Sequence, residues 1–347
     1  MVGGTLVGIG KMDKEGKPVP LTQDARPIVM GHVFRKLVFK CTFRLDATTI
    51  RDRLLPHQVA VGVSGGAEAL VHATRDWIGR SRGDATSVLL QKDVKNAFNE
   101  ILPEIFLDEC RRHAPSSARF AEWCYGTPSN LVYDGEVATS SRGQQGCPMM
   151  MSLFCLARKR LVEEAQANIG SDVLFAPEYA DDGFSGGRVD EVLRLFREEL
   201  RLAEEYGLRY DLSNCTLYLL AGDAFRGDVS AFQALGVRID TTCNIQILKT
   251  PVCGSPEFLA EWKSDFERQF QALEELDQKH VAFHLLQTCM GWPQLNYLGR
   301  TAPRHFLIPL LEWYDGRYRE AFENLFGGKL TNAQWLQAML PRALLVV

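Results

Sequence analysis

The order of predicted secondary structure changes twice along the 347-residue chain. The N-terminal part favours a β-hairpin, with strands from Thr5 to Met12 and from Pro18 to Pro27 around a turn that ends at Gly16. The middle mixes short apolar strands with amphipathic helices, and the part after residue 250 carries only helical patterns. This order predicts an α+β protein with a helical C-terminal module.

The individual elements follow from the spacing of apolar residues and from turn signals. Helical spacing indicates helices over 67–78, 103–113, 190–206, 256–273, 281–289 and 332–340. Short apolar or alternating runs indicate strands over 87–91, 130–133, 136–139, 173–175, 217–220 and 235–239. The Asp134-Gly135 pair predicts a two-residue hairpin between the second and third of these strands.

Bulk composition limits the class of protein. With 46% hydrophobic residues, a chain of this length can bury the cores of two or three subdomains. Because no run approaches about 20 apolar residues and no signal peptide is evident, we expect an intracellular protein, nuclear or cytoplasmic, without a membrane partner. The nine cysteines are scattered and form no C-x-x-C pair, which indicates neither a disulfide framework nor a zinc site.

The distribution of charge is more informative than the net charge of -4, which argues against a protein that coats nucleic acid with its whole surface. Residues 1–60 hold ten Lys and Arg against five Asp and Glu. This basic stretch could form one wall of a groove that follows phosphates. An ordinary solvated face explains the same charges equally well.

Three aspartates form the pattern with the clearest chemistry. Asp93 follows the predicted strand over 87–91, and Asp181 and Asp182 lie in a predicted tight turn after the strand over 173–175. Joining a nucleotide to a primer needs two divalent cations about 3.5 to 4 Å apart. Such cations prefer carboxylate oxygens. If the two strands are neighbours, these acids can hold the cations, although each acid taken singly is more often a solvated loop residue.

Three strings extend the pattern of acids. They are Asp93-Val-Lys-Asn-Ala-Phe98, Arg142-Gly-Gln-Gln-Gly-Cys-Pro148 and Tyr179-Ala-Asp-Asp182. Their order and spacing resemble the palm motifs of reverse transcriptases, and the chain resembles the non-LTR retrotransposon branch of that family.

Further residues carry the same resemblance, which runs collinearly from about residue 5 to residue 240. Gln58 and the glycines that follow it are similar to the family's lead into the next helix, and Gly207-Leu208 with Asp211 resembles the fourth palm motif. Two other pieces are Lys11 with Arg26-Pro-Ile28, which resembles the fingers pattern, and Leu235-Gly236, which resembles the primer-grip hairpin.

The resemblance implies a fold and an order of domains. The fold would be α+β and of the right-hand polymerase type, with fingers and palm made of an antiparallel sheet plus helices. The fingers would cover residues 1–80, and the palm would cover 81–245, with part of the fingers around 100–130. Residues 246–347 would form a helical, thumb-like region.

The resemblance also implies residue roles. Asp93, Asp181 and Asp182 would be the catalytic residues and the ligands of two Mg²⁺ or Mn²⁺ ions. Phe98 would block a ribose 2′-hydroxyl and favour deoxynucleotides, whereas without the resemblance a core phenylalanine is the simpler interpretation. The other implied substrate-binding residues are Lys11 and Arg26, which would hold the triphosphate, Gln145 and Gly146, which would lie under the nucleotide, and Tyr179.

The implied activity is that of an RNA-templated DNA polymerase, the reverse transcriptase core of a retroelement. Its partners would be an RNA template, a DNA or RNA primer and a deoxynucleoside triphosphate.

Two departures from the family pattern leave other functions open. Asn214 stands where the family usually has a lysine, and an amide cannot neutralise the leaving pyrophosphate. Gly183 stands where an apolar residue is common, which predicts a looser turn. The alternative is therefore a catalytically weak remnant that only binds RNA or an RNA/DNA hybrid. A nucleotide cyclase would share the acids but has no need of polymerase fingers.

Overall fold

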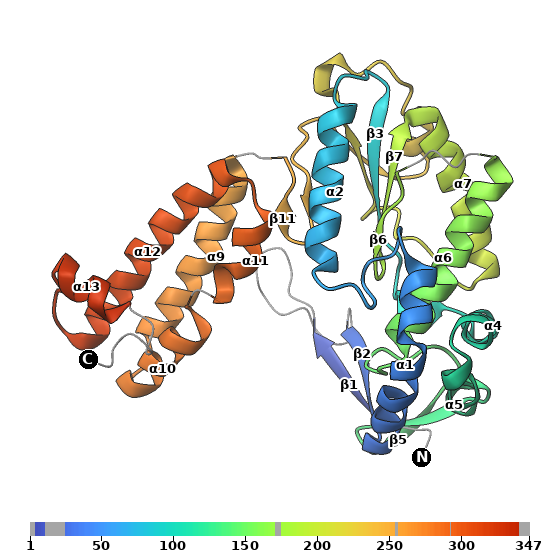
Figure 1. The fold of residues 1–347 in the computed structure, drawn as a ribbon, viewed down its shortest axis with the longest axis horizontal. Coiled ribbons are helices and arrows are strands. Elements are labelled where there is room, and N and C mark those ends of the chain that lie inside the picture. Colours follow the sequence, from blue (N-terminus) through green and yellow to red (C-terminus); the bar gives the residue numbers. More distant parts are fainter. Residues whose placement is uncertain (1–3, 11–24, 171–174, 254–255, 292, 340–347) are drawn as a thin grey trace. The chain divides into compact units, whose positions relative to one another are not determined.

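The computed structural model describes residues 4–10, 25–170, 175–253, 256–291 and 293–339 (Figure 1). The chain divides into two compact units, Met1–Cys243 and Asn244–Val347. Each unit has its own cluster of buried hydrophobic residues.

A five-stranded sheet forms the centre of the first unit. Its order is β6 (Glu178–Tyr179), β7 (Asp182–Arg188), β3 (Ser87–Lys92), β8 (Thr216–Leu219) and β9 (Arg238–Asp240). The central strand β3 pairs antiparallel with both β7 and β8, and the apolar residues Val88, Leu89 and Leu90 are completely buried. Burial on both faces explains why β3 reads as a continuous apolar run rather than an alternating one.

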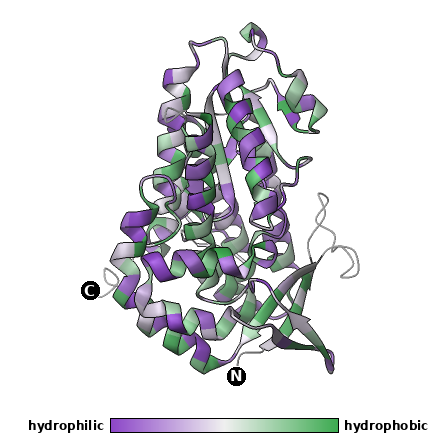
Figure 2. Cartoon of the chain, turned by 90° about the vertical axis from the view of Figure 1, so that its right-hand side faces the viewer, coloured by the Kyte–Doolittle hydropathy of each residue, from purple (hydrophilic) through white to green (hydrophobic). Residues whose placement is uncertain are grey.

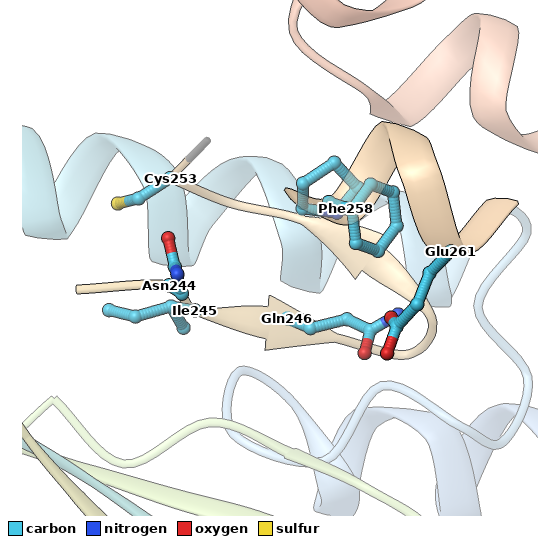
Figure 3. A pocket seen from close by; sticks show the side chains of 7 residues that line it. Asn244, Ile245, Gln246, Cys253, Phe258 and Glu261 are labelled. Carbon is cyan, nitrogen blue, oxygen red and sulfur yellow. The ribbon is translucent and has the colours of Figure 1, made fainter. Parts of the chain in front are cut away.

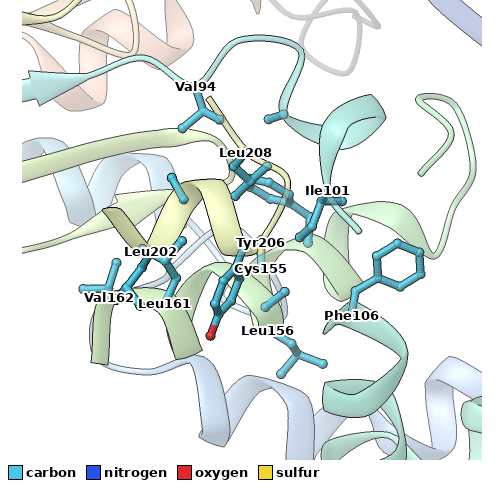
Figure 4. Close-up of a cluster of buried hydrophobic side chains, with 14 of the residues drawn as sticks. Val94, Ile101, Phe106, Cys155, Leu156, Leu161, Val162, Leu202, Tyr206 and Leu208 are labelled. Carbon is cyan, nitrogen blue, oxygen red and sulfur yellow. The ribbon is translucent and has the colours of Figure 1, made fainter. Parts of the chain in front are cut away.

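Helices pack around this sheet. Trp77 of α2 (Gly66–Ser81) lies so close to Gly186 of β7 that an added Cβ would approach its ring to 2.4 Å, so only glycine fits there. α6 (Met150–Ile169) packs against α7 (Val189–Glu205), and α7 also contacts β3 and β7. α4 (Pro103–His113) and α5 (Pro115–Tyr125) join the same core, part of which is drawn in Figure 4.

A second sheet of this unit has four strands. Its order is β2 (Ala25–Gly31), β1 (Gly4–Gly10), β4 (Ser129–Tyr133) and β5 (Glu136–Ser140). Asp134 and Gly135, which join β4 to β5, both have positive φ, at 49° and 82°. This is the conformation that a two-residue hairpin needs. The long helix α1 (Val33–Leu54) and two short helices, α3 (Ala97–Glu100) and α8 (Ser230–Ala234), complete the regular structure of the unit, with a 3-10 turn at Gly222–Ala224.

The second unit is mainly helical. A small hairpin, β10 (Gln246–Ile247) and β11 (Thr250–Pro251), precedes α9 (Pro256–Glu274), α10 (Lys279–Cys289), α11 (Pro293–Thr301), α12 (Arg304–Phe326) and α13 (Asn332–Ala338). Its core is built around Phe266, Phe270, Leu286 and Tyr314. Figure 2 shows hydrophilic and hydrophobic stretches alternating along the helices, as helices with one face against a core require. None of the helices within the described ranges is long and apolar enough to cross a membrane.

The α+β prediction is confirmed, as are strands or helices at most of the predicted ranges. The second N-terminal strand was predicted to end too early, because β2 continues beyond Pro27 to Gly31; residues 18–24 of the predicted strand lie outside the described residues. β2 is an edge strand, where the missing N–H of a proline is tolerated. The predicted turn of this hairpin lies outside the described residues, as do residues 173 and 174 of the strand predicted over 173–175.

The predicted hairpin at Leu235-Gly236 is wrong. Leu235 caps the C-terminus of α8, and Gly236, at φ 87°, leads into β9, which runs parallel to β8. A parallel neighbour needs a crossover instead of a hairpin, and α8 supplies it. The sequence patterns also missed α1, because apolar residues occur on both of its faces and conceal the helical period.

Candidate active site

The position of Asp93 follows from the sheet order. Asp93 is the first residue after β3, so it lies at the end of the central strand. On one side, Lys92 of β3 faces Gly183 of β7, next to Asp182. On the other side, Asp93 binds the segment before β8 through its backbone: the Asp211 N–H donates to its carbonyl at 2.9 Å, and its own N–H donates to Cys215 Sγ at 3.4 Å. Asp93 is therefore held between two neighbouring loops.

Asp181 and Asp182 come from a tight turn between β6 and β7. Tyr179 pairs with Asp182, which leaves Ala180 and Asp181 as the two residues of the turn. Ala180 has a positive φ of 56°, a strained conformation for a residue other than glycine. This turn is the neighbour of Asp93 that the sequence analysis required.

The pKa of Asp182 shows that the three carboxyl groups share one environment. Burial, followed by the charges of Asp181 and Asp93, raises the pKa of Asp182 from 3.8 to about 6. A bound cation would relieve the repulsion between these carboxylates. The three carboxylates therefore suit a hard divalent metal ion. In the described part of the chain, however, no three His, Cys, Asp or Glu side chains converge as a ready metal cage.

Asn214 contacts the acids directly. Its side-chain amide donates to Asp93 Oδ2 and to Asp211 Oδ2, each at 3.1 Å. Ser213 Oγ donates to the other oxygen of Asp211 at 2.6 Å. The amide therefore bridges Asp93 to a fourth acid, Asp211, but it brings no positive charge to the site.

Gln58 holds the Ala180 turn, a role that the sequence analysis did not identify. Its completely buried side chain donates from Nε2 to the Ala180 carbonyl at 3.1 Å and accepts from the Ala180 N–H at 2.9 Å through Oε1. Both polar groups of the strained peptide are thus satisfied by one side chain. The sequence offered no signal for this contact, because the two residues are 122 positions apart.

The loop that contains Gln145 and Gly146 is tied to the segment that carries Phe98. The Gln145 N–H donates to Asn99 Oδ1 at 3.1 Å, and Arg142 donates to the Glu100 carbonyl at 2.8 Å. Phe98 is partly buried and packs edge-on against Phe154, with ring centroids 5.0 Å apart. The structure therefore brings two of the predicted substrate-binding segments together.

The same loop also contacts β2. The Val29 N–H donates to the Gln145 carbonyl at 2.8 Å, and a Cβ added to Gly146, at φ 95°, would lie 2.7 Å from the Val29 carbonyl. A glycine is required at this close approach. β2 includes Arg26, whose side chain is not described, and Lys11 lies outside the described residues.

A buried ionic cluster lies behind the acids. Lys92 donates to Glu199 Oε1 at 2.7 Å, and Arg158 donates to Glu178 at 2.9 Å and to Glu199 Oε2 at 3.1 Å. The Tyr210 hydroxyl donates to Glu199 Oε2 at 2.6 Å. The four charged side chains are almost fully buried, Tyr210 is partly buried, and the two cations balance the two carboxylates.

The cluster adjoins the segments that carry the acids. Lys92 precedes Asp93, Glu178 precedes Tyr179, and Tyr210 precedes Asp211. A Cβ added to Gly183 would lie 3.1 Å from Lys92 Cε and 3.4 Å from Arg158 Nη2. The space that Gly183 leaves is therefore filled by the cluster. Two signals in the sequence indicate this ionic cluster. They are a lysine, Lys92, in an apolar strand, and a glutamate, Glu199, among the apolar residues of α7.

A separate pocket occurs in the second unit and has a different character. It has a volume of about 360 Å³ and is lined by residues of the β10–β11 hairpin and of α9, among them Gln246, Phe258 and Glu261 (Figure 3). None of the predicted site residues lines this pocket. The acids of the first unit remain the candidate active site.

The fold of the chain is right-hand polymerase-like, as a comparison with solved structures shows. The chain is similar to telomerase from Candida albicans, solved in a complex with the TWJ fragment of telomeric RNA, with a TM-score of 0.57 at 10% sequence identity. The match covers 97% of this chain and 56% of the telomerase, so the chain spans about half of that protein. At this identity the likeness concerns the fold alone.

Two other telomerase structures match more weakly. Apo telomerase from Candida tropicalis has a TM-score of 0.44 at 10% identity, over 93% of this chain and 63% of that one. A form of the same telomerase truncated from its C-terminal domain has a TM-score of 0.45 at 8% identity, over 62% and 50%. No protein-family model and no curated protein matches the chain.

Proposed function

We propose that the chain is the core of an RNA-templated DNA polymerase, a reverse transcriptase of the non-LTR retroelement type. The observation that carries this proposal is the meeting of Asp93, Asp181 and Asp182 at one end of the central sheet, where burial and, after it, the charges of the other two raise the pKa of Asp182. A right-hand polymerase-like fold around these acids supports it. In this proposal residues 1–80 are fingers, 81–245 palm and 246–347 a thumb-like region.

The three aspartates would bind the metal ions that the reaction needs. Asp93, Asp181 and Asp182 would hold two Mg²⁺ or Mn²⁺ ions, which when bound activate the primer 3′-hydroxyl and neutralise the triphosphate. A bond forms between the 3′-oxygen and the α-phosphorus, the bond to the β-phosphate oxygen breaks, and the hydroxyl proton and pyrophosphate leave.

Other residues would position the substrates. Gly146, which has no side chain, allows its backbone to come close to the Val29 carbonyl of β2. Gln145, in the same loop, would contact the incoming nucleotide. Phe98, held by its contact with Phe154, would lie under the sugar and disfavour a 2′-hydroxyl. Lys11, Arg26 and Tyr179 would complete the nucleotide pocket from the fingers side and from the turn.

Primer extension tests the proposal. The purified chain, an RNA template, a DNA primer, deoxynucleoside triphosphates and Mg²⁺ or Mn²⁺ should give extended product, and chelation of the metal should abolish it. Asp181→Ala and Asp93→Asn should each lower the rate by at least about 100-fold, since each removes a charge that the reaction needs. Asp223→Ala, on an exposed turn of the same unit, is the matched control. Equal product from Asp181→Ala and from the wild type would contradict the proposal.

Asn214 favours a second function, namely binding of RNA or an RNA/DNA hybrid by a catalytically weak remnant that does not extend a primer. The Asn214 amide donates hydrogen bonds to Asp93 and Asp211, but it brings no positive charge to the leaving pyrophosphate. This function requires salt-sensitive binding of the hybrid in the same preparation that fails to extend a primer. Efficient extension excludes it as the main function.

A further inference from the structure

The segment 211–215, which precedes and begins β8, binds Asp93 through both backbone and side chain. The Asp211 N–H donates to the Asp93 carbonyl at 2.9 Å, and the Asp93 N–H donates to Cys215 Sγ at 3.4 Å. The side chain of Asn214 adds a third hydrogen bond, from Nδ2 to Asp93 Oδ2 at 3.1 Å. One short segment therefore fixes the backbone of Asp93 and also contacts its carboxylate.

The turn that carries Asn214 is itself fixed by hydrogen bonds. The backbone N–H groups of Asn214 and Cys215 both donate to the Asp211 carbonyl, at 3.0 and 3.1 Å. The Ser213 hydroxyl donates to Asp211 Oδ1 at 2.6 Å, and Asn214 Nδ2 donates to Asp211 Oδ2 at 3.1 Å. Because both carboxylate oxygens of Asp211 accept hydrogen bonds within the turn, Asp211 serves as an anchor for the Asn214 amide.

The two carboxylates determine which way round the Asn214 amide lies. Its Nδ2 carries two hydrogens, and the hydrogen bonds to Asp93 and Asp211 use both of them. A flipped amide would place its carbonyl oxygen against two carboxylate oxygens, which would repel it. The amide is therefore a donor to both aspartates, and it fixes the position of Asp93 Oδ2.

The other oxygen of the Asp93 carboxylate is open to a cation. Within the described ranges, hydrogen bonds reach Oδ2 of this carboxylate and not Oδ1. A carboxylate that accepts a hydrogen bond at one oxygen can bind a metal ion with the other, and partners of this kind orient metal ligands. The Asn214 amide is placed to do this for Asp93.

We propose that Asn214 is a positioning residue that orients the Asp93 carboxylate toward a bound metal ion. The inference rests on the proposed function, in which Asp93 is a metal ligand. It gives Asn214 a role that a neutral amide can fill, because orienting a carboxylate needs a hydrogen-bond donor and no positive charge.

Metal binding by the chain alone tests this role. Mn²⁺ is titrated into the full chain, and electron paramagnetic resonance measures the free ion. Asp93→Asn should remove a Mn²⁺ site that the wild type has. Asn214→Ala should weaken binding at that site by about tenfold, because loss of a partner that orients a metal ligand typically lowers affinity by about 10- to 100-fold. Asn214→Leu, which keeps the shape of the side chain without the donor, should give the same loss.

Asn168→Ala is the matched control. Asn168 of α6 also donates from an exposed amide to a carboxylate, Glu198 Oε1 of α7, at 2.7 Å. Its alanine variant should bind Mn²⁺ like the wild type. The asparagine variants should all keep the melting temperature of the wild type, because both asparagines are exposed. In primer extension, the Mg²⁺ concentration that gives half of the maximal rate should rise by about tenfold in Asn214→Ala.

The results separate this inference from the proposed function. If Asp93→Asn removes the Mn²⁺ site but Asn214→Ala binds the ion as tightly as the wild type, or more tightly, the positioning role is wrong and the proposed function stands. A loss that Asn214→Leu does not share, or that Asn168→Ala also shows, would equally contradict the role of the donor. If Asp93→Asn and the wild type bind Mn²⁺ alike, Asp93 is not a metal ligand, and both the inference and the proposed function fail.

Discussion

At the scale of single residues, the turn that presents Asp181 depends on Gln58. The turn contains Ala180 at positive φ, and one buried amide satisfies both of its backbone polar groups. Strain in the backbone persists only where its surroundings hold it. The geometry of the acids is therefore set partly by a side chain that binds the backbone of the turn between them.

Gln58→Ala should destabilise the chain by about 3 kcal/mol, because two buried backbone groups lose their partner. Urea unfolding measures this change. Gln233→Ala, at an exposed position, should stay within about 0.5 kcal/mol of the wild type. Ala180→Gly should be nearly neutral, since the relief of strain offsets the added freedom of the unfolded chain. If Gln58→Ala unfolds like the wild type, the amide does not hold the turn.

Gly183→Val should cost about 2 kcal/mol or more, because the new side chain meets Lys92 and Arg158 in a filled interior. The matched control is Gly79→Ala in α2, where no atom lies within 4 Å of the added Cβ and helix propensity should raise stability by about 0.5–1 kcal/mol. Thermal and urea unfolding distinguish the two variants. Equal stability of Gly183→Val and wild type would refute the packing argument.

At the scale of elements, the ionic cluster joins β3, β6, α6 and α7 behind the acids. Burial alone would raise the pKa of Glu199, but Lys92 and Arg158 outweigh it and lower the pKa from 4.5 to about 2. A lowered pKa means that the folded state prefers the ionised group. The stabilisation of the folded state by ionised Glu199 is therefore complete above pH 4.5 and is lost as the pH falls toward 2.

This linkage predicts the acid stability of the chain. The free energy of unfolding of the wild type should fall by about 3 kcal/mol more than that of Glu199→Gln between pH 5 and pH 2. The groups that face Glu199 are Lys92, Arg158 and Tyr210. Urea unfolding over a series of pH values measures the difference. Parallel pH profiles of the two proteins would show that Glu199 is not the linked group.

At the scale of the whole molecule, each unit has its own core. A mutation in one core should therefore destabilise that unit and leave the stability of the other unit unchanged. Phe270 is completely buried in the second unit, packs on Tyr314 with centroids 5.4 Å apart, and lies under the Arg317 guanidinium. Phe270→Ala should therefore destabilise the second unit by about 3–5 kcal/mol.

Hydrogen exchange read by mass spectrometry locates this loss. Protection should fall over 256–326 and stay unchanged over 87–92 and 216–219. Phe196→Ala, which removes a buried ring of the first core, should produce the opposite pattern. Loss of protection in both units from either variant would show that the chain unfolds as one cooperative body.

The sequence by itself determined the class of the fold and the positions of the three acids along the chain. Local rules were sufficient for this, since an apolar run marks β3, Asp134-Gly135 marks a hairpin, and Gly207 at φ 73° ends α7. Only the tertiary structure decided that Gln58 holds Ala180, that Lys92 and Arg158 meet Glu199, and that β9 is a parallel strand. These contacts join residues far apart in sequence, and their stability comes from burial that no local pattern encodes.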